Sequence, residues 1–230
     1  MTHKTMPMVR SLLAAALFGS LLAGCANKPP EPEWEMNAHG SAQKALDAYL
    51  SGNTRVDKLE WERARAEVAR TGRPDLLARL ELLRCAAQVA SLVVEPCTAF
   101  EALRQDAAAP ERAYADHLAG RALAAPDVAL LPAAQRAVAT PGSGGAALGA
   151  IEDPLSRLVA AGVLLQAGRA DPAAIATATD TASAQGWRRP LMAWLLLQVQ
   201  RAEAAGDKDA AERLRRRVAV VELAGVSMGK

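Results

Sequence analysis

The sequence predicts an all-α protein, built as an irregular array or bundle of helical hairpins. Hydrophobic residues make up 51% of the chain, but many of them are alanine and only 3% of all residues are aromatic. Alanine has the highest helix propensity, whereas sheets favour branched and aromatic side chains. Apolar residues also recur at helical spacing, and glycine, proline and aspartate separate the periodic segments. Together these observations favour closely packed helices.

Ten segments are predicted to be helical. They are residues 41–50, 56–70, 76–90, 97–105, 110–124, 127–139, 154–166, 172–184, 190–205 and 208–223. Gly52 ends the first segment. The second has glutamate–arginine pairs at i, i+3, which we expect on a solvated face: Glu60/Arg63, Glu62/Arg65 and Glu67/Arg70. The third is the most apolar and has one stripe, formed by Leu76, Leu80, Leu83 and Ala87.

Several later segments open with proline in the first turn. The clearest starts are Asp153-Pro154 and Asp171-Pro172. Aspartate accepts hydrogen bonds from the free N–H groups of a first turn, and proline lacks the N–H that would need a partner there. These two helix starts are therefore the best defined in the sequence.

A short turn pattern recurs three times, as Gly72-Arg-Pro-Asp75, Gly168-Arg-Ala-Asp171 and Gly206-Asp-Lys-Asp209. In each, glycine can end one helix in the left-handed conformation and aspartate can cap the next, which predicts tight helical hairpins. The region from Trp187 to Arg217 resembles a tetratricopeptide-type repeat. Its packing positions would be Trp187, Leu191, Trp194, Ala202 and Ala210. The Trp-Leu-Gly-Tyr signature of that family is not reproduced, and an irregular bundle explains the same turns.

Residues 140–150 contain four glycines and are expected to form a flexible connection between two halves of the body. A nucleotide-binding loop would need a preceding strand, and a P-loop would also need a Gly-Lys-Ser/Thr ending. Neither is present. Ser143 lies in Pro-Gly-Ser-Gly-Gly, which departs from the Gly-x-Ser-x-Gly nucleophile elbow.

The first 24 residues have the parts of a secretory signal peptide, which is removed from the mature protein. Lys4 and Arg10 precede an apolar run of about a dozen residues, whereas a membrane-spanning helix needs roughly 20. The run ends in Leu22-Ala23-Gly24-Cys25, which resembles the lipobox of bacterial lipoproteins. That resemblance implies that Cys25 is acylated and becomes the first residue. An ordinary signal peptide with Cys25 as a plain thiol is the alternative.

The lipobox resemblance also implies where the chain is held. In that family an Asp directly after the cysteine retains a lipoprotein at the inner membrane, and here the position is Ala26. The outer membrane is therefore implied, with the body in the periplasm. One acyl chain holds a protein marginally at a bilayer and two or more hold it stably. Residues 25–37, rich in proline and glutamate, are expected to form an extended tether that includes Trp34, with the helical body at 38–230.

With Cys25 acylated, Cys85 and Cys97 are the two cysteines left in an oxidising compartment, which favours a disulfide between them. This pairing requires the helix that contains Cys85 to end near Ala90, so that residues 91–96 can return along that helix and bring Cys97 beside Cys85. Two buried free thiols are the alternative. Zinc is not expected, because no histidines accompany the two cysteines at ligand spacing.

The charge balance argues against a nucleic-acid partner, and the lack of a recognisable catalytic set argues for a non-enzymatic protein. The leader carries two of the 27 basic side chains and none of the 25 acidic ones, so the mature chain is balanced and offers no basic footprint for nucleic acid. His39 and His117 are the histidines that remain as bases after processing. Asp116-His117 could pair in principle, but adjacent helical residues point about 100° apart, which favours a surface coincidence. We predict no catalytic residues, metal or cofactor.

The sequence thus predicts a membrane-anchored lipoprotein that serves as a helical protein-interaction module and binds an envelope protein. The predicted partner surface includes Trp187, Trp194, Arg213 and Arg216. The arginines belong to a cluster, Arg213, Arg215, Arg216 and Arg217, for which a solvated face that stabilises the last helix is favoured over a site for an anionic partner. Two alternatives are an enzyme acting on the cell wall or another envelope polymer, and a small-ligand carrier with an apolar cavity near Trp187 and Trp194.

Overall fold

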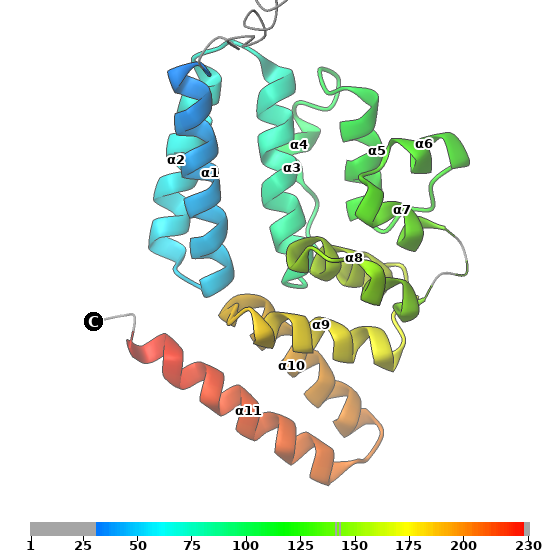
Figure 1. Ribbon diagram of the computed structural model, residues 1–230. Coiled ribbons are helices and arrows are strands. Elements are labelled where there is room, and N and C mark those ends of the chain that lie inside the picture. The colour runs from blue at the N-terminus through cyan, green and yellow to red at the C-terminus, as the bar shows by residue number, and fades with distance from the viewer. Residues whose placement is uncertain (1–30, 141, 143, 228–230) are drawn as a thin grey trace, which may run out of the picture. The chain divides into compact units, whose positions relative to one another are not determined.

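The computed structural model describes residues 31–140, 142 and 144–227. The predicted signal peptide, the lipobox-like motif with Cys25, residues 25–30 of the predicted tether, and Ser143 lie outside the described residues. The described part is helical, without strands (Figure 1). Its helices are α1 (Glu33–Ser51), α2 (Thr54–Ala69), α3 (Pro74–Ala90), α4 (Thr98–Glu101), α5 (Ala109–Leu118), α6 (Ala125–Leu130), α7 (Ala133–Ala139), the 3₁₀ helix η1 (Gly145–Ala150), α8 (Pro154–Gln166), α9 (Pro172–Ala184), α10 (Arg188–Ala204) and α11 (Lys208–Ser227).

The all-α prediction is confirmed, and the best-defined helix starts are confirmed with their caps. The carboxylate of Asp153 accepts a hydrogen bond from Ser156 N at 2.6 Å, and that of Asp171 accepts one from Ala174 N at 2.7 Å. α8 and α9 have the predicted bounds. None of the helices in the described ranges is both long enough and apolar enough to cross a bilayer.

Other boundaries differ from the predictions for local reasons. α1 begins at Glu33, so the tether is not extended as far as residue 37 and Trp34 is helical. Two glutamates in its first turn complement the helix dipole, and its alanines pack against α2. Segment 127–139 is broken by Pro132 into α6 and α7. Segment 97–105 keeps only the short α4, and segment 110–124 ends at Leu118, two residues before Gly120. Part of the glycine-rich connection forms η1.

The predicted hairpin turns form, although the capping residue differs in two of them. Gly72, Gly168 and Gly206 all adopt the left-handed conformation, with φ of 63°, 67° and 75°. Before α11, Asp207 rather than Asp209 accepts the hydrogen bond from Ala210 N, at 2.9 Å. Before α3, Asp75 is already inside the first turn and pairs with Arg73. The glycines therefore predicted all three turns, whereas the predicted aspartate caps the following helix in one of them.

The charged pairs of α2 are only partly a solvated face. Glu60/Arg63 and Glu67/Arg70 form as predicted, at 2.5 and 2.9 Å. Arg65 instead reaches Glu81 of α3, at 3.0 Å, rather than Glu62. Glu60 and Glu81 are buried, so this side of α2 packs against a neighbouring helix.

The main core lies where α3, α8 and α9 meet. α1 and α2 pack as an antiparallel hairpin beside α3, while α8 and α9 lie across the end of α3 (Figure 1). Gly162 allows α8 to approach α3 closely, since a Cβ there would lie 2.3 Å from Val89 O. Trp194 of α10 fills the same core, and its indole donates a hydrogen bond to Ala90 O at 3.1 Å.

A disulfide joins Cys85 of α3 to Cys97, directly before α4, with a Cα–Cα distance of 5.9 Å. α3 ends at Ala90, and Leu92 has a positive φ of 58° in the turn that follows. The chain therefore runs back along α3 as the pairing required. The predicted disulfide is confirmed.

Two arginines at the start of α10 join it to the end of α1. Arg188 donates hydrogen bonds to Ser51 O and Gly52 O, at 3.2 and 3.1 Å. Arg189 donates to Tyr49 O at 2.7 Å, and its guanidinium lies 4.4 Å from the centre of the Tyr49 ring. The last carbonyls of a helix have no partner within it, so these guanidinium groups cap α1 from a distant part of the chain.

Candidate functional site

The structure separates the four residues predicted to form a partner surface. Trp194 is completely buried, so the prediction that it lies on a partner surface is wrong, while Trp187 is partly buried and packs against the core. Trp194 lies on the inner side of α10 and Trp187 directly before that helix, where their area stabilises helix packing. Arg213 and Arg216 are exposed on α11. Nothing brings the tryptophans and these arginines together.

The exposed arginines continue into an exposed apolar stripe. Helical spacing places five residues within one arc of α11, which we name the outer face: Arg213, Arg216, Arg217, Val220 and Leu223. Val220 is 67% exposed and Leu223 is 71% exposed, more than the other large apolar side chains of the described chain. Arg215 points elsewhere and pairs with Glu203 of α10.

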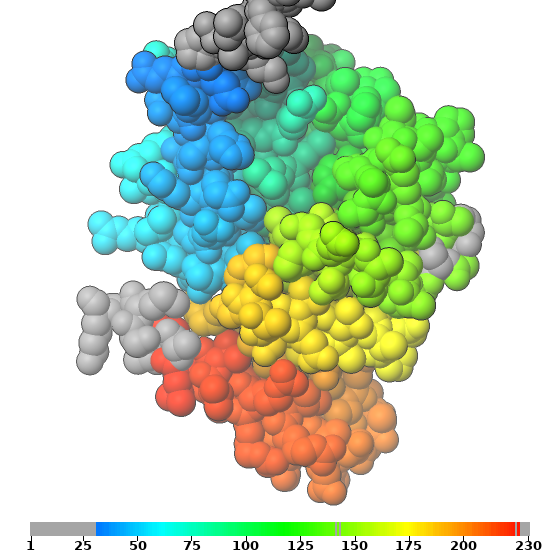
Figure 2. All heavy atoms as spheres, viewed as in Figure 1, coloured from blue at the N-terminus to red at the C-terminus, as the bar shows by residue number. Residues whose placement is uncertain are grey.

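α11 packs mainly against α10, through Ala211, Leu214, Val218 and Val221. On the side of the molecule drawn in Figure 2, the red atoms of α11 lie at the surface, while α9 packs against α10. An uncovered helix face that combines arginine with large apolar residues has the composition of a protein interface.

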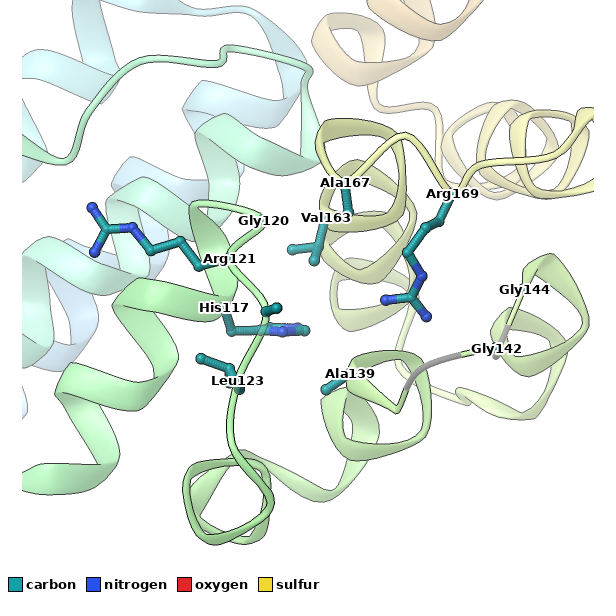
Figure 3. Close-up of a pocket in the computed structure, with 11 residues that line it drawn as sticks. His117, Gly120, Arg121, Leu123, Ala139, Gly142, Gly144, Val163, Ala167 and Arg169 are labelled. Atoms are coloured by element: carbon teal, nitrogen blue, oxygen red, sulfur yellow. The ribbon is translucent and has the colours of Figure 1, made fainter.

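A second feature is a cavity of about 570 Å³ between α5, α7 and α8, which we name the His117 cavity (Figure 3). Its walls are formed mainly by small and apolar residues, with three side chains that carry nitrogen: His117, Arg121 and Arg169. Figure 3 shows Arg121 pointing away from His117 and Arg169 reaching toward Ala139. The Arg169 guanidinium donates hydrogen bonds to Val138 O and Thr140 O, at 3.0 and 2.9 Å.

His117 is a buried core histidine. Its Nε2 lies 3.1 Å from Gln135 Oε1, and the amide of Gln135 donates to Ser156 O at 2.9 Å. The hydrogen bond to Ser156 O fixes the Gln135 amide with its oxygen toward His117. Because that oxygen can only accept, Nε2 of the imidazole carries the hydrogen and Nδ1 has the lone pair. Burial lowers the pKa of His117, the Gln135 bond partly opposes this, and the charge of Arg169 lowers it further. The imidazole is therefore neutral at pH 7.

Asp116 does not orient this histidine. Its carboxylate pairs with Arg104 at 2.7 Å and with Arg121 at 2.5 Å. Burial raises the pKa of Asp116, but the two guanidinium groups outweigh that effect and the pKa is lowered. The two adjacent residues thus belong to separate networks. His117, however, is buried, so the prediction that the pair lies on the surface is wrong.

A third feature is a more apolar cavity, of about 460 Å³, which we name the α3–α5 cavity. Its lining comes from α3, from α5 and from the α6–α7 turn: Arg79, Leu82, Leu83, Ala86, Pro110, Glu111, Tyr114, Leu130, Leu131, Pro132 and Arg136. A small-ligand carrier was expected to have such a cavity near Trp187 and Trp194. The space there is filled by Trp194, and the apolar cavity lies elsewhere.

Sequence reasoning missed Gln135 and the α3–α5 cavity. A single glutamine in an alanine-rich segment gives no signal, and the cavity needs residues more than 50 positions apart. Within the described ranges, no three His, Cys, Asp or Glu residues are placed to hold a metal ion. Glu111 is the only carboxylate that lines either named cavity.

Comparison with known proteins found no matching family model, no matching curated protein and no matching solved structure.

Proposed function

We propose that the chain is a lipid-anchored lipoprotein of the bacterial outer membrane, whose helical body binds an envelope protein through the outer face of α11. The anchor is inferred from the lipobox at Leu22–Cys25. The observation that carries the binding function is the outer face itself, where three exposed arginines adjoin Val220 and Leu223. A partner with an acidic rim around apolar side chains would complement it.

Energetics favour a protein interface over a merely solvated face. Exposed arginines alone are ordinary on a helix, and their stems cover apolar surface. Val220 and Leu223 have no such cover, since both are about two-thirds exposed or more. Burying a large aliphatic side chain contributes about 1.5–3 kcal/mol. A partner that covers both residues gains this contribution, and the arginines fix its orientation.

The proposal is tested by photo-crosslinking in living cells from position 220 of α11. We expect one defined protein adduct, which charge reversal of Arg213, Arg216 and Arg217 to Glu abolishes. Position 59 of α2 is the matched control, because Leu59 is also an exposed apolar residue, at 47%. Equal adducts from both positions, or none from either, would contradict the partner surface.

The same cells test the anchor. Cys25→Ser should move the protein from the membrane fraction to the soluble envelope fraction and remove incorporated fatty acid, since one thiol is the attachment point. A Cys25→Ser protein that stays in the membrane fraction through washing with salt would rule out the lipid anchor. That result would leave the crosslinking result on the partner surface intact.

A further inference from the structure

We propose that the α3–α5 cavity is a binding site for a single fatty-acyl chain with an anionic end group. This inference goes beyond the proposed function and does not depend on the anchor or on the outer face of α11. It rests on three observations: the apolar walls of the cavity, the incomplete packing of α6 above it, and the two hydrogen-bond donors in its lining that have no carboxylate partner.

The walls fit an aliphatic chain. α3 contributes Leu82, Leu83 and Ala86, and the α6–α7 turn contributes Leu130, Leu131 and Pro132. The volume of about 460 Å³ lies within the range of small-molecule sites, about 300–1,000 Å³. Seven of the eleven lining residues are aliphatic, and the other four are Arg79, Glu111, Tyr114 and Arg136, so an acyl chain would meet mainly methyl and methylene groups.

α6 lacks the packing that an apolar ligand would supply. None of its six residues is buried, and it contacts only its neighbours α5 and α7 substantially. Leu130 is 38% exposed although it borders the cavity. An acyl chain in the cavity would bury this side chain, and the methylenes of the ligand would leave water at the same time.

The charged groups of the lining favour an anionic end over a cationic one. Glu111 Oε1 accepts two hydrogen bonds from Arg79, at 3.0 and 2.7 Å, so these two charges neutralise each other. Arg136 is exposed, donates its Nε–H to Leu131 O at 2.8 Å, and has no carboxylate partner in the described chain. The cavity lining therefore carries one net positive charge, from Arg136.

Tyr114 supplies a second donor. Its hydroxyl has no hydrogen-bond partner among the described residues, and the partly buried side chain lines the cavity. Burial, and to a smaller extent the charge of Asp153, raises the pKa of Tyr114, so the hydroxyl keeps its proton. A protonated hydroxyl and a guanidinium together are donors for a carboxylate or a phosphate.

The test uses the full chain with Cys25→Ser and the Cys85–Cys97 disulfide formed, without detergent, in calorimetric titrations with dodecanoate, dodecanol and dodecylamine. We expect saturable 1:1 binding of dodecanoate and weaker binding of dodecylamine. Lysophosphatidylglycerol with the same acyl length distinguishes a free fatty acid from a phospholipid as the source of the ligand. Whichever of the two binds more tightly identifies that source.

Substitutions in the lining locate the site. Arg136→Glu should weaken dodecanoate binding about tenfold or more and leave dodecanol binding nearly unchanged, because only the anion contacts the guanidinium. Leu130→Asp should weaken both, since it places a charge in the apolar wall. The matched control is Arg55→Glu on α2, an exposed arginine outside the cavity and the outer face, which should change neither. Unfolding curves show whether each variant is folded.

Absence of saturable dodecanoate binding would overturn the proposal, as would dodecylamine binding as tightly as dodecanoate. Dodecanoate affinity unchanged by both Arg136→Glu and Leu130→Asp would also overturn it. An adduct from a photo-crosslinker at position 130 with an envelope protein, in place of acyl binding, would assign the cavity to a peptide. The crosslinking from position 220 reports on the proposed function separately.

Discussion

His117 illustrates how burial sets the chemistry of one side chain. The imidazole is held in a neutral form by its low-dielectric surroundings and by Gln135, and the positive charge of Arg169 opposes protonation. An exposed histidine at the same position would titrate near its ordinary pKa, about 6.5. The residue therefore couples the stability of the α5–α7–α8 region to pH.

We expect His117→Gln to reduce the dependence of the unfolding free energy on pH between about 7.5 and 5.5. Since the folded pKa is lowered, the contribution of the neutral imidazole is fully present above the unfolded pKa of about 6.5. It is lost as the pH falls below that value, because the unfolded chain takes up a proton that the folded chain does not. Urea unfolding at several pH values measures this.

The wild-type protein should therefore lose more stability on acidification than the variant, by up to about 1.4 kcal/mol per pH unit. The comparison variant is His39→Gln on α1, which removes an exposed histidine instead of a buried one. Identical slopes for wild type and His117→Gln would show that the imidazole is not held neutral.

At the scale of elements, the contact of α8 with α3 depends on the absence of a side chain at Gly162. An added Cβ would lie 2.3 Å from Val89 O and 2.8 Å from a methyl of Val89, closer than real Cβ contacts. The neighbouring backbone belongs to the last turn of α3 and cannot rotate away as a flexible side chain could. The two helices would have to separate.

Gly162→Ala should therefore destabilise the protein by about 1–3 kcal/mol, despite the better helix propensity of alanine. Gly40→Ala is the matched control, because that glycine is also inside a helix and its Cβ would meet nothing within 4 Å. The control should stabilise by up to about 1 kcal/mol. Denaturant unfolding of both variants measures these effects, and a stable Gly162→Ala variant would contradict the close approach.

At the scale of the molecule, Arg188 and Arg189 connect the start of α10 to the end of α1. Their hydrogen-bond partners, Tyr49, Ser51 and Gly52, are some 136 to 140 positions away in the sequence. The first hairpin and the C-terminal helices are thus joined by side chains that satisfy terminal helix carbonyls. This connection makes the array more cooperative than a row of hairpins that touch only their neighbours.

Arg189→Ala should lower the unfolding free energy by about 1–3 kcal/mol, because it removes the side-chain hydrogen bond to Tyr49 O, which then keeps only the Gly52 N–H, and removes the contact with the Tyr49 ring. Amide hydrogen exchange should then speed up in α10 and α11 more than in α3. Arg201→Ala, an exposed arginine in the last turn of α10, should change neither quantity. Equal amide exchange rates in α10 and α11 of the wild type and of Arg189→Ala would show that the Arg189 contacts do not couple α1 to the C-terminal helices.

Local signals in the sequence were sufficient for several features of the fold. The caps at Asp153 and Asp171, the bounds of α8 and α9, and the left-handed glycines of the turns depend on residues a few positions apart. The Cys85–Cys97 pairing also needed only the end of one helix and a short return. Such features follow from propensity, capping and chain geometry, which the neighbouring residues fix by themselves.

The candidate sites could be predicted less well, because they depend on which helix faces meet. From the sequence, Trp194 was predicted to lie on a partner surface, but its side chain is buried in the core that α10 shares with α3. Arg65 reaches Glu81 on another helix instead of its neighbour Glu62. The α3–α5 cavity is likewise formed by segments distant in the chain, whereas the arginines of α11 were identified because they form a contiguous cluster.

The sequence by itself determined the helical class, the hairpin turns, the disulfide and the expectation of a lipid anchor at Cys25. Tertiary structure alone decided that His117 is neutral and buried, that α1 is joined to α10, and that an apolar cavity lies beneath α6. The physical reason is the distance along the chain over which each kind of interaction acts. Backbone propensities and caps act over about one helical turn, whereas burial and cavities arise only when separate helices pack together.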